Sequence, residues 1–258
     1  MTTGTRKPGE FCWSNMITPQ PAAARDFFAA MFGWTYQELP GLGHSMRVDG
    51  HDIGAMFDRD DPSTPKGTAP HIGVLVMIAD ADAFTARVIE LGGEAHPPFA
   101  VAEQGRMVIC ADPNGARFDA WEPKKATLTD GDSHAHGAAT FHETLTTDID
   151  RATAFYTALF GWTPVHVRTP EYAYTTFSLR GIPVAGMMEI TPPMAEAGVT
   201  PHWGTYFAVR DTDEAARVAV ANGGALFIPP HDIPNVGRFC GVTSPQGVRF
   251  YCITYPPR

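Results

Sequence analysis

The chain has 258 residues, 44% hydrophobic residues and a formal net charge of −9 at pH 7. This length suits one large or two small domains, and an acidic chain without clustered Lys and Arg lacks the electrostatic surface for binding nucleic acid or an anionic membrane. No run of eighteen consecutive apolar residues occurs, and the first residues lack the apolar stretch of a signal peptide, so we expect a cytoplasmic location.

In the first quarter of the chain, the residue pattern predicts one strand, one helix and three further strands. Residues 11–18 have the composition of a strand, and Pro19 and Pro21 mark the entry to a helix over residues 22–32. Strands are expected at residues 34–39, 44–48 and 52–57. This order is a βαβββ unit, and the polar, proline-broken residues 58–69 connect it to the next one.

The second quarter repeats this order. An apolar strand over residues 70–78 leads into a helix over residues 80–91, which Gly92-Gly93 ends. Two strands follow, at residues 106–111 and 116–121, on either side of an Asp-Pro-Asn-Gly turn. Residues 122–137 lack periodicity and bulky apolar side chains, which is typical of a linker.

The second half of the chain repeats the first half. The segment FYTALFGW at residues 155–162 matches FFAAMFGW at residues 27–34. The offset is nearly constant along the chain: 161 − 33 = 128, 223 − 92 = 131 and 247 − 115 = 132 for matching glycines. One supersecondary unit is therefore used four times, and each copy needs a neighbour to bury its sheet face.

These motifs resemble those of the vicinal oxygen chelate superfamily, which contains glyoxalase I, bleomycin-resistance proteins and extradiol dioxygenases. The resemblance rests on the segment from Asp148 to Trp162, on the Gly-Gly helix ends and on the (D/S)-P-x-G turns before each last strand. Residues 201–203, 228–230 and 236–239 resemble an actinobacterial, antigen-like branch with two domains in tandem.

The resemblance implies an α+β fold in which four βαβββ units form two tandem glyoxalase-like domains with cupped mixed β-sheets. The expected division is an N-terminal tail at residues 1–9, domain 1 at 10–121, a linker at 122–137 and domain 2 at 138–258.

The same resemblance implies a divalent metal held by His and Glu from the first and last strands of paired units. Counting from the motifs, these positions carry side chains that cannot ligate, namely Trp13, Gly73, Phe141 and Gly204 on first strands and Tyr251 on a last strand. Only Asp119, on the other last strand, could bind a metal, and a metal site needs three or four donors. We therefore expect no metal ligands and no cofactor; the alternative is one divalent metal ion held by a shifted set such as His142, Glu189 and His202.

Strand alternation predicts which side chains line the concave faces of the two cups. The candidate ligand-binding residues are Trp13, Asn15, His71 and Asp119 in the first half and Phe141, Glu143, His202, Tyr206 and Tyr251 in the second. Any of them could instead belong to an ordinary solvated sheet face. His71 and His202 could cap strand ends, and Glu143 could be the structural partner of an arginine.

The sequence therefore predicts a protein that binds a small organic molecule, aromatic or carbonyl-bearing, in a cupped cleft without an obligatory metal. Two alternatives stay open: a metal-dependent lyase, isomerase or dioxygenase of the same superfamily, and a protein-interaction role without a small-molecule site. Whether the chain is catalytic is left open. Beyond the small molecule we expect no nucleic-acid or membrane partner, and either a monomer or a homodimer.

Overall fold

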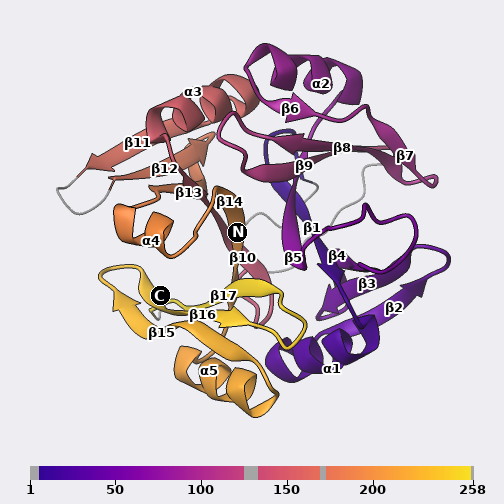
Figure 1. The fold of residues 1–258 in the computed structure, drawn as a ribbon, viewed down its shortest axis with the longest axis vertical. Helices are drawn as coiled ribbons and strands as arrows, with labels where there is room; N and C mark the ends of the chain where they lie inside the picture. The colour runs from indigo at the N-terminus through magenta and orange to yellow at the C-terminus, as the bar shows by residue number, and fades with distance from the viewer. Residues whose placement is uncertain (1–5, 125–132, 169–172, 257–258) are drawn as a thin grey trace.

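A computed structural model describes residues 6–124, 133–168 and 173–256. Within these ranges the chain forms two large mixed sheets, one in each half (Figure 1). The elements of the first half are β1 (Phe11–Thr18), α1 (Pro21–Phe32), β2 (Thr35–Leu39), β3 (Gly43–Val48), β4 (His51–Asp58), β5 (His71–Met77), α2 (Ala81–Glu90), β6 (Glu94–Ala95), β7 (Phe99–Val101), β8 (Gly105–Ala111) and β9 (Arg117–Pro123).

The second half has the same order, except that it adds the short helix α4 and has one strand, β15, where the first half has β6 and β7. Its elements are β10 (Ala139–Thr146), α3 (Ile149–Phe160), β11 (Thr163–Arg168), β12 (Ala173–Leu179), β13 (Ile182–Glu189), α4 (Pro192–Glu196), β14 (His202–Ala208), α5 (Thr212–Ala221), β15 (Ala225–Ile233), β16 (Gly237–Thr243) and β17 (Arg249–Thr254). The predicted α+β class and the four βαβββ units are confirmed.

Besides the unpredicted helix α4, two further departures from the predicted order are local. In the second unit, two short strands, β6 and β7, stand where one strand was expected, and both pair with β8. Strand β9 runs to Pro123, two residues into the predicted linker, because it pairs with β8 as far as Gly105. Residues 1–5 of the expected tail and 125–132 of the expected linker lie outside the described residues, so the domain boundaries stay a prediction.

The first strand of each half lies at the centre of its sheet. Strand β1 pairs parallel with β4 and antiparallel with β5, and β10 pairs in the same way with β13 and β14. Side chains of β1 and β10 therefore have a strand on both sides. This is why Asn15 and Glu143, at matching positions of these strands, lie in the middle of the two concave faces.

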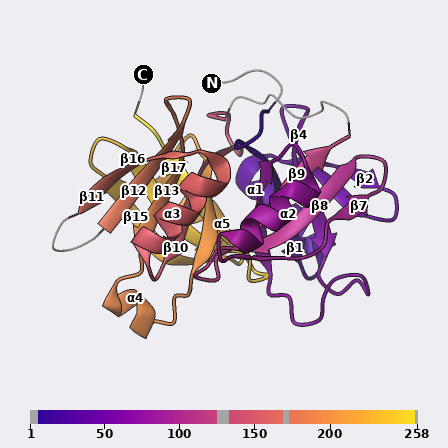
Figure 2. The same cartoon turned by 90° about the horizontal axis from the view of Figure 1, so that it is seen from above.

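The helices cover the opposite, convex faces, each on the strands of its own half, and helices of the two halves meet at the boundary. Figures 1 and 2 show α2 beside α3, and Figure 1 shows α1 beside α5 at the other end of the molecule. One core cluster joins Phe28 of α1 to Phe207 and Phe250 of the second half, and the other joins Phe118 of the first half to Tyr156 of α3. Each half therefore contributes side chains to the core of the other, whereas the repeat predicted only that each unit packs on some neighbour.

The tryptophan of the repeated F-G-W motif ties the halves together reciprocally. Trp34 Nε1 donates to the carbonyl oxygen of Gly137, 2.8 Å away, and Trp162 Nε1 donates to that of Gly9, 2.9 Å away. Gly9 precedes β1 and Gly137 precedes β10, so each motif holds the segment that leads into the first strand of the other half. Both indoles are buried and need a hydrogen-bond acceptor, which this contact supplies.

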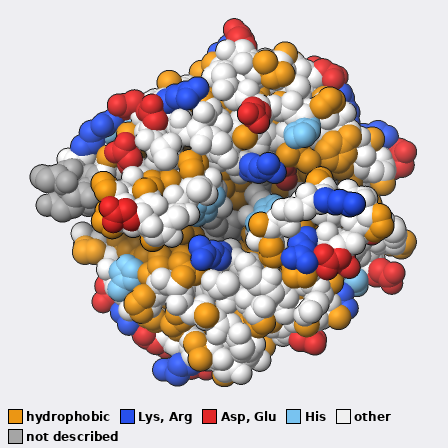
Figure 3. Space-filling view, in the orientation of Figure 1, with side chains coloured by type: hydrophobic (Ala, Val, Ile, Leu, Met, Phe, Trp, Pro, Cys, Tyr) orange, Lys and Arg blue, Asp and Glu red, His pale blue; other side chains and the backbone are white. Residues whose placement is uncertain are grey.

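The molecular surface mixes charges rather than separating them. On the face seen in Figure 3, acidic and basic side chains alternate around the edge, and the surface is hollowed near the centre of that face. Within the described ranges, the structure has no helix of the length and apolar character needed to cross a lipid bilayer.

Candidate functional site

Glu143 lies at the centre of the C-terminal cup, the concave face that also carries Phe141, Tyr206 and Tyr251. The residue is 8% exposed, and its carboxylate accepts hydrogen bonds from Tyr174, with Oη–Oε2 at 2.7 Å, and from Tyr206, with Oη–Oε1 at 3.1 Å. Burial raises the pKa of Glu143, and the two phenol hydrogen bonds lower it only in part. Glu143 is thus hydrogen-bonded to two phenol hydroxyl groups, and not to an arginine as the structural alternative predicted.

Glycines on both neighbouring strands make room for tyrosine rings beside Glu143. Its register partners are Gly186 on β13 and Gly204 on β14. A Cβ atom on Gly186 would lie 2.1 Å from the hydroxyl of Tyr174, and one on Gly204 would lie 2.6 Å from Cε2 of Tyr251. Both glycines therefore have their side-chain space filled by a tyrosine, and any larger residue would displace the ring.

An aromatic wall surrounds this carboxylate. The rings of Tyr206 and Tyr251 are stacked, with centroids 4.4 Å apart and planes at 13°, because their strands pair at those residues. Phe141 meets Tyr206 edge-on, with centroids 6.0 Å apart. Phe141 and Phe227 are only partly buried, so the wall also has apolar surface that a ligand ring can reach.

The N-terminal cup, formed by Trp13, Asn15, His71 and Asp119 with Met107, is built differently. Asn15 Nδ2 lies 3.4 Å from Asp119 Oδ2 and 3.6 Å from Met107 Sδ. Desolvation raises the pKa of Asp119 to about 7, while the Asn15 hydrogen bond and the charge of Arg117 lower it by less. The partly buried side chains Trp13, Met107 and Trp121 form the apolar part of this face.

The space above the central glycine differs between the cups. A Cβ atom on Gly73, which matches Gly204, would lie 3.6 Å from both Asp119 Oδ2 and His71 Nε2, which is ordinary van der Waals distance. No ring fills this space. Desolvation and the nearby Arg117 lower the pKa of His71, although a hydrogen bond to Ala69 raises it. The N-terminal cup therefore has room for one methyl group between a carboxyl group and an imidazole.

His71 and His202 begin matching strands and are held in the same way. Nδ1 lies 2.8 Å from the carbonyl oxygen of Ala69 in one case and 2.7 Å from that of Thr200 in the other. A carbonyl oxygen can only accept, so each Nδ1 carries a proton and donates it to that oxygen. These contacts are the strand-end capping that the sequence left as an alternative; a ligand-binding role for either histidine stays a prediction.

The donors present do not fit the divalent metal site that the resemblance implies. In the parts of the chain that the structure describes, no three His, Cys, Asp or Glu side chains gather closely enough to hold a metal ion. Asp119 and His71 are two potential ligands, but the nearby Asn15 turns its amide nitrogen, not its oxygen, toward Asp119. Three or four convergent donors are needed, and this cup offers fewer.

The alternative metal ligands His142, Glu189 and His202 do not gather into a metal-binding group among the described residues, so this ligand set is wrong, and the alternative of one divalent metal ion held by other residues stays open. His142 points to the convex face, opposite to Glu143, with its ring centroid 4.2 Å from that of Phe11 and Nδ1 3.2 Å from Thr205 Oγ1. Alternation along β10 is the reason, since neighbouring residues face opposite sides.

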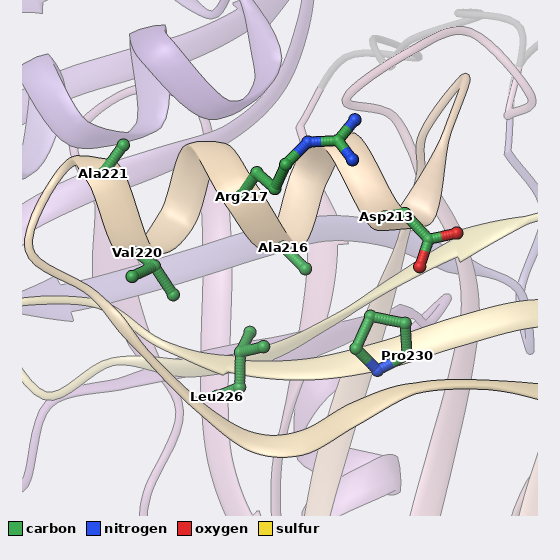
Figure 4. A pocket seen from close by; sticks show the side chains of 7 residues that line it. All are labelled: Asp213, Ala216, Arg217, Val220, Ala221, Leu226 and Pro230. Carbon is green, nitrogen blue, oxygen red and sulfur yellow. The ribbon is translucent and has the colours of Figure 1, made fainter.

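Among the described residues, two of the shallow surface grooves lie away from Glu143 and Asp119. One lies between α5 and β15, where Val220 and Ala216 point toward Leu226 and Pro230 (Figure 4). The other lies where residues 232–238 meet residues 254–256, at the edge of the C-terminal cup. Neither groove is lined by a predicted site residue.

Tyr174, Gly186 and the wall residue Phe227 are members of the C-terminal cup that the sequence did not reveal. Tyr174 comes from β12, and its ring reaches Glu143 across β13 only because Gly186 has no side chain. A glycine in mid-strand signals close approach by another group, and Gly186 was the one available sign.

Two family descriptions match the two halves. Residues 13–121 match the family described as "Glyoxalase-like domain", and residues 141–251 match "Glyoxalase/Bleomycin resistance protein/Dioxygenase superfamily". Both matches begin within the first strand of a half and end within its last strand.

Whole-chain relatives agree with this assignment. "Putative glyoxylase CFP32" of Mycobacterium tuberculosis (strain CDC 1551 / Oshkosh) is 34% identical over 255 residues, 95% of each chain. "Anthracycline biosynthesis protein DnrV" of Streptomyces peucetius is 32% identical over 259 residues, 94% of this chain and 92% of that protein. The Mn(II)-bound glyoxalase from Novosphingobium aromaticivorans shares the fold, with a TM-score of 0.66 and 12% identity over 96% of this chain and 82% of that one. The chain therefore belongs to the glyoxalase/bleomycin resistance protein/dioxygenase superfamily, as a member with one glyoxalase-like domain in each half.

Proposed function

We propose that this protein binds a small aromatic or carbonyl-bearing organic molecule in its C-terminal cup, without an obligatory metal. One observation carries the proposal: the buried Glu143 carboxylate is held by two phenol hydroxyls beside the stacked rings of Tyr206 and Tyr251. Burying a carboxylate costs free energy, and a cup that served only packing would place an apolar side chain there.

The arrangement suits recognition of a flat ring. Phe141 and Phe227 offer partly exposed aromatic surface for stacking, and Glu143 with Tyr206 offers hydrogen-bonding groups that fix the orientation of the ligand. The relative named for anthracycline biosynthesis adds support, because anthracyclines are aromatic compounds with carbonyl groups.

The test is calorimetric titration and native mass spectrometry with two soluble probes, 2-naphthol and anthraquinone-2-sulfonate. We expect one molecule of at least one probe to bind per chain. Glu143→Gln and Tyr206→Phe should each weaken binding by about 1–3 kcal/mol, because each removes a buried hydrogen bond, with little loss of stability. If the wild type binds neither 2-naphthol nor anthraquinone-2-sulfonate, the proposal is contradicted.

Two comparisons locate the site. Asp119→Asn makes the same acid-to-amide change in the other cup, and a loss of binding in Asp119→Asn but not in Glu143→Gln would move the site to the N-terminal cup. A large drop in melting temperature for Glu143→Gln with unchanged binding would make Glu143 a structural partner.

Elemental analysis of the purified protein measures its metal content. One tightly held metal ion per chain that ligand binding requires would favour the enzyme alternative.

A further inference from the structure

Tyr174 completes the hydrogen bonding of Glu143 from outside the central strands. It lies on β12, which pairs with β13 on one side and with the edge strand β11 on the other. Its hydroxyl group is 2.7 Å from Glu143 Oε2 and occupies the space left open by Gly186. The Tyr174 ring is partly exposed, whereas Glu143 and Tyr206 beneath it are buried.

The position of Tyr174 is not what core packing requires. The buried clusters that the structure forms include Phe177 of the same strand on the convex face, but Tyr174 belongs to none of the buried sets. In the N-terminal half, the matching strand β3 (GHSMRV) carries no aromatic residue at all. The fold therefore does not need a ring here, and the N-terminal cup stays uncovered without one.

The two tyrosines that serve Glu143 differ in how they are held. The Tyr206 ring is stacked on Tyr251 and lies against Phe141 and Phe239, so its hydroxyl group is fixed. Among the ring contacts within the described ranges, Tyr174 has none. One phenol is thus part of the wall, and the other can turn outward about its side-chain torsions without breaking an aromatic contact.

We propose that Tyr174 is an internal stand-in for the ligand, and that the ligand is a phenol whose hydroxyl group replaces that of Tyr174 at Glu143 Oε2. This rests on the proposed function and names its ligand class. The exchange keeps the hydrogen-bond count, because one phenol donor leaves Oε2 and another arrives. A ring without a hydroxyl group would leave a buried carboxylate oxygen unpaired, which is the strongest form of discrimination a polar site achieves.

The first test uses the same substitution at the two hydroxyls of one carboxylate. Tyr174→Phe removes the competing donor, so the affinity for 2-naphthol should rise about tenfold, whereas Tyr206→Phe should lower it by a similar factor. The matched ligand 2-methoxynaphthalene, which has no hydroxyl donor, should not gain from Tyr174→Phe. Weaker or unchanged 2-naphthol binding by Tyr174→Phe would overturn the inference and leave the proposed function standing.

The second test does not depend on wild-type binding. Tyr174→Ala removes the phenol side chain that fills this position. Added phenol should therefore raise the melting temperature of this variant more than added benzene does. Tyr36→Ala, in the matching edge hairpin β2–β3 but without a carboxylate partner, should show no preference for phenol over benzene. Equal effects of phenol and benzene on Tyr174→Ala would overturn the inference, even if 2-naphthol fails to bind the wild type and the proposed function is rejected separately.

Discussion

The two cups share a backbone and differ in chemistry at matching positions. Where the C-terminal cup has Glu143, Tyr206 and Tyr251, the N-terminal cup has Asn15, Leu75 and Asp119, and the paired register is the same in both. The central glycine, Gly204 or Gly73, is covered by a ring in one cup and open in the other. One cup is filled by its own aromatic side chains, and the other keeps a free space beside a carboxyl group.

This difference shows which residues stay alike in the two halves of a repeated chain and which become different. The convex faces of both halves must fit helices from the opposite half, so their large apolar residues recur, as Phe118 and Phe250 do. Among the described residues, no helix packs on the concave faces, so a single residue there can change without a matching change in a helix. Even the convex junctions diverge in part, since Asp112, Tyr156 and Trp203 form a buried hydrogen-bonded chain where the other junction has Phe28 and Ile72.

The largest expected effect concerns charge in the N-terminal cup. The pKa of Asp119 is raised to about 7, so the folded protein loses stability as pH rises from about 4 to about 7 and loses no more above that. Asp119→Asn removes this loss. At about 1.4 kcal/mol per pKa unit, the variant should be more stable than the wild type by roughly 2–4 kcal/mol at pH 8, and by less at pH 5.

Urea unfolding at a series of pH values measures the effect of Asp119→Asn. Tyr251→Phe, at the matching position, is the control, because burial raises the pKa of Tyr251 and keeps its hydroxyl group protonated throughout this range. A wild-type stability that changes with pH in parallel with that of Asp119→Asn would show that the Asp119 carboxyl group is hydrated and that the cups are electrostatically alike.

The next effect concerns packing in the C-terminal cup. Gly204→Ala places a methyl group 2.6 Å from Cε2 of Tyr251, so the ring must leave its stack with Tyr206, at a cost of about 1–3 kcal/mol in the free energy of unfolding. A double-mutant cycle tests the cause: in a Tyr251→Ala background the same substitution should cost little. An equal cost in both backgrounds would place the strain elsewhere.

The sequence was sufficient for the fold and for the neighbourhood of Glu143. Helix ends and unit order follow from apolar periodicity and from glycines such as Gly33 and Gly161, both of which end their helices in the left-handed conformation. Counting residues from these fixed points gave the strand register, and alternation then placed Glu143, Tyr206 and Tyr251 on one face, where the structure has them in contact.

Counting from motifs and alternation along one strand do not predict contacts between strands that are distant in sequence. Tyr174 reaches Glu143 over an intervening strand, and a bulge at Phe177–Ser178 shifts the β12–β13 register, so no counting from motifs predicts the contact. The reciprocal packing of helices between halves was expected only as stacking on some neighbour. The shifted metal set failed because His142, next to Glu143 in sequence, faces the opposite side of the sheet.

The smallest expected effect is the most direct check on the open space in the N-terminal cup. At Gly73 a methyl group meets its nearest neighbours, Asp119 Oδ2 and His71 Nε2, at 3.6 Å, so Gly73→Ala needs no rearrangement. Removing a glycine also reduces the freedom of the unfolded chain, so the free energy of unfolding should rise by about 0.5 kcal/mol at pH 5.

That gain should shrink at pH 8, because the methyl group takes water away from the Asp119 carboxylate and raises its pKa further. Parallel urea unfolding of Gly73→Ala and Gly204→Ala at both pH values makes the comparison within one experiment. If Gly73→Ala costs as much as Gly204→Ala, the N-terminal cup is packed as tightly as its counterpart, and the distinction between an open cup and a filled one is wrong.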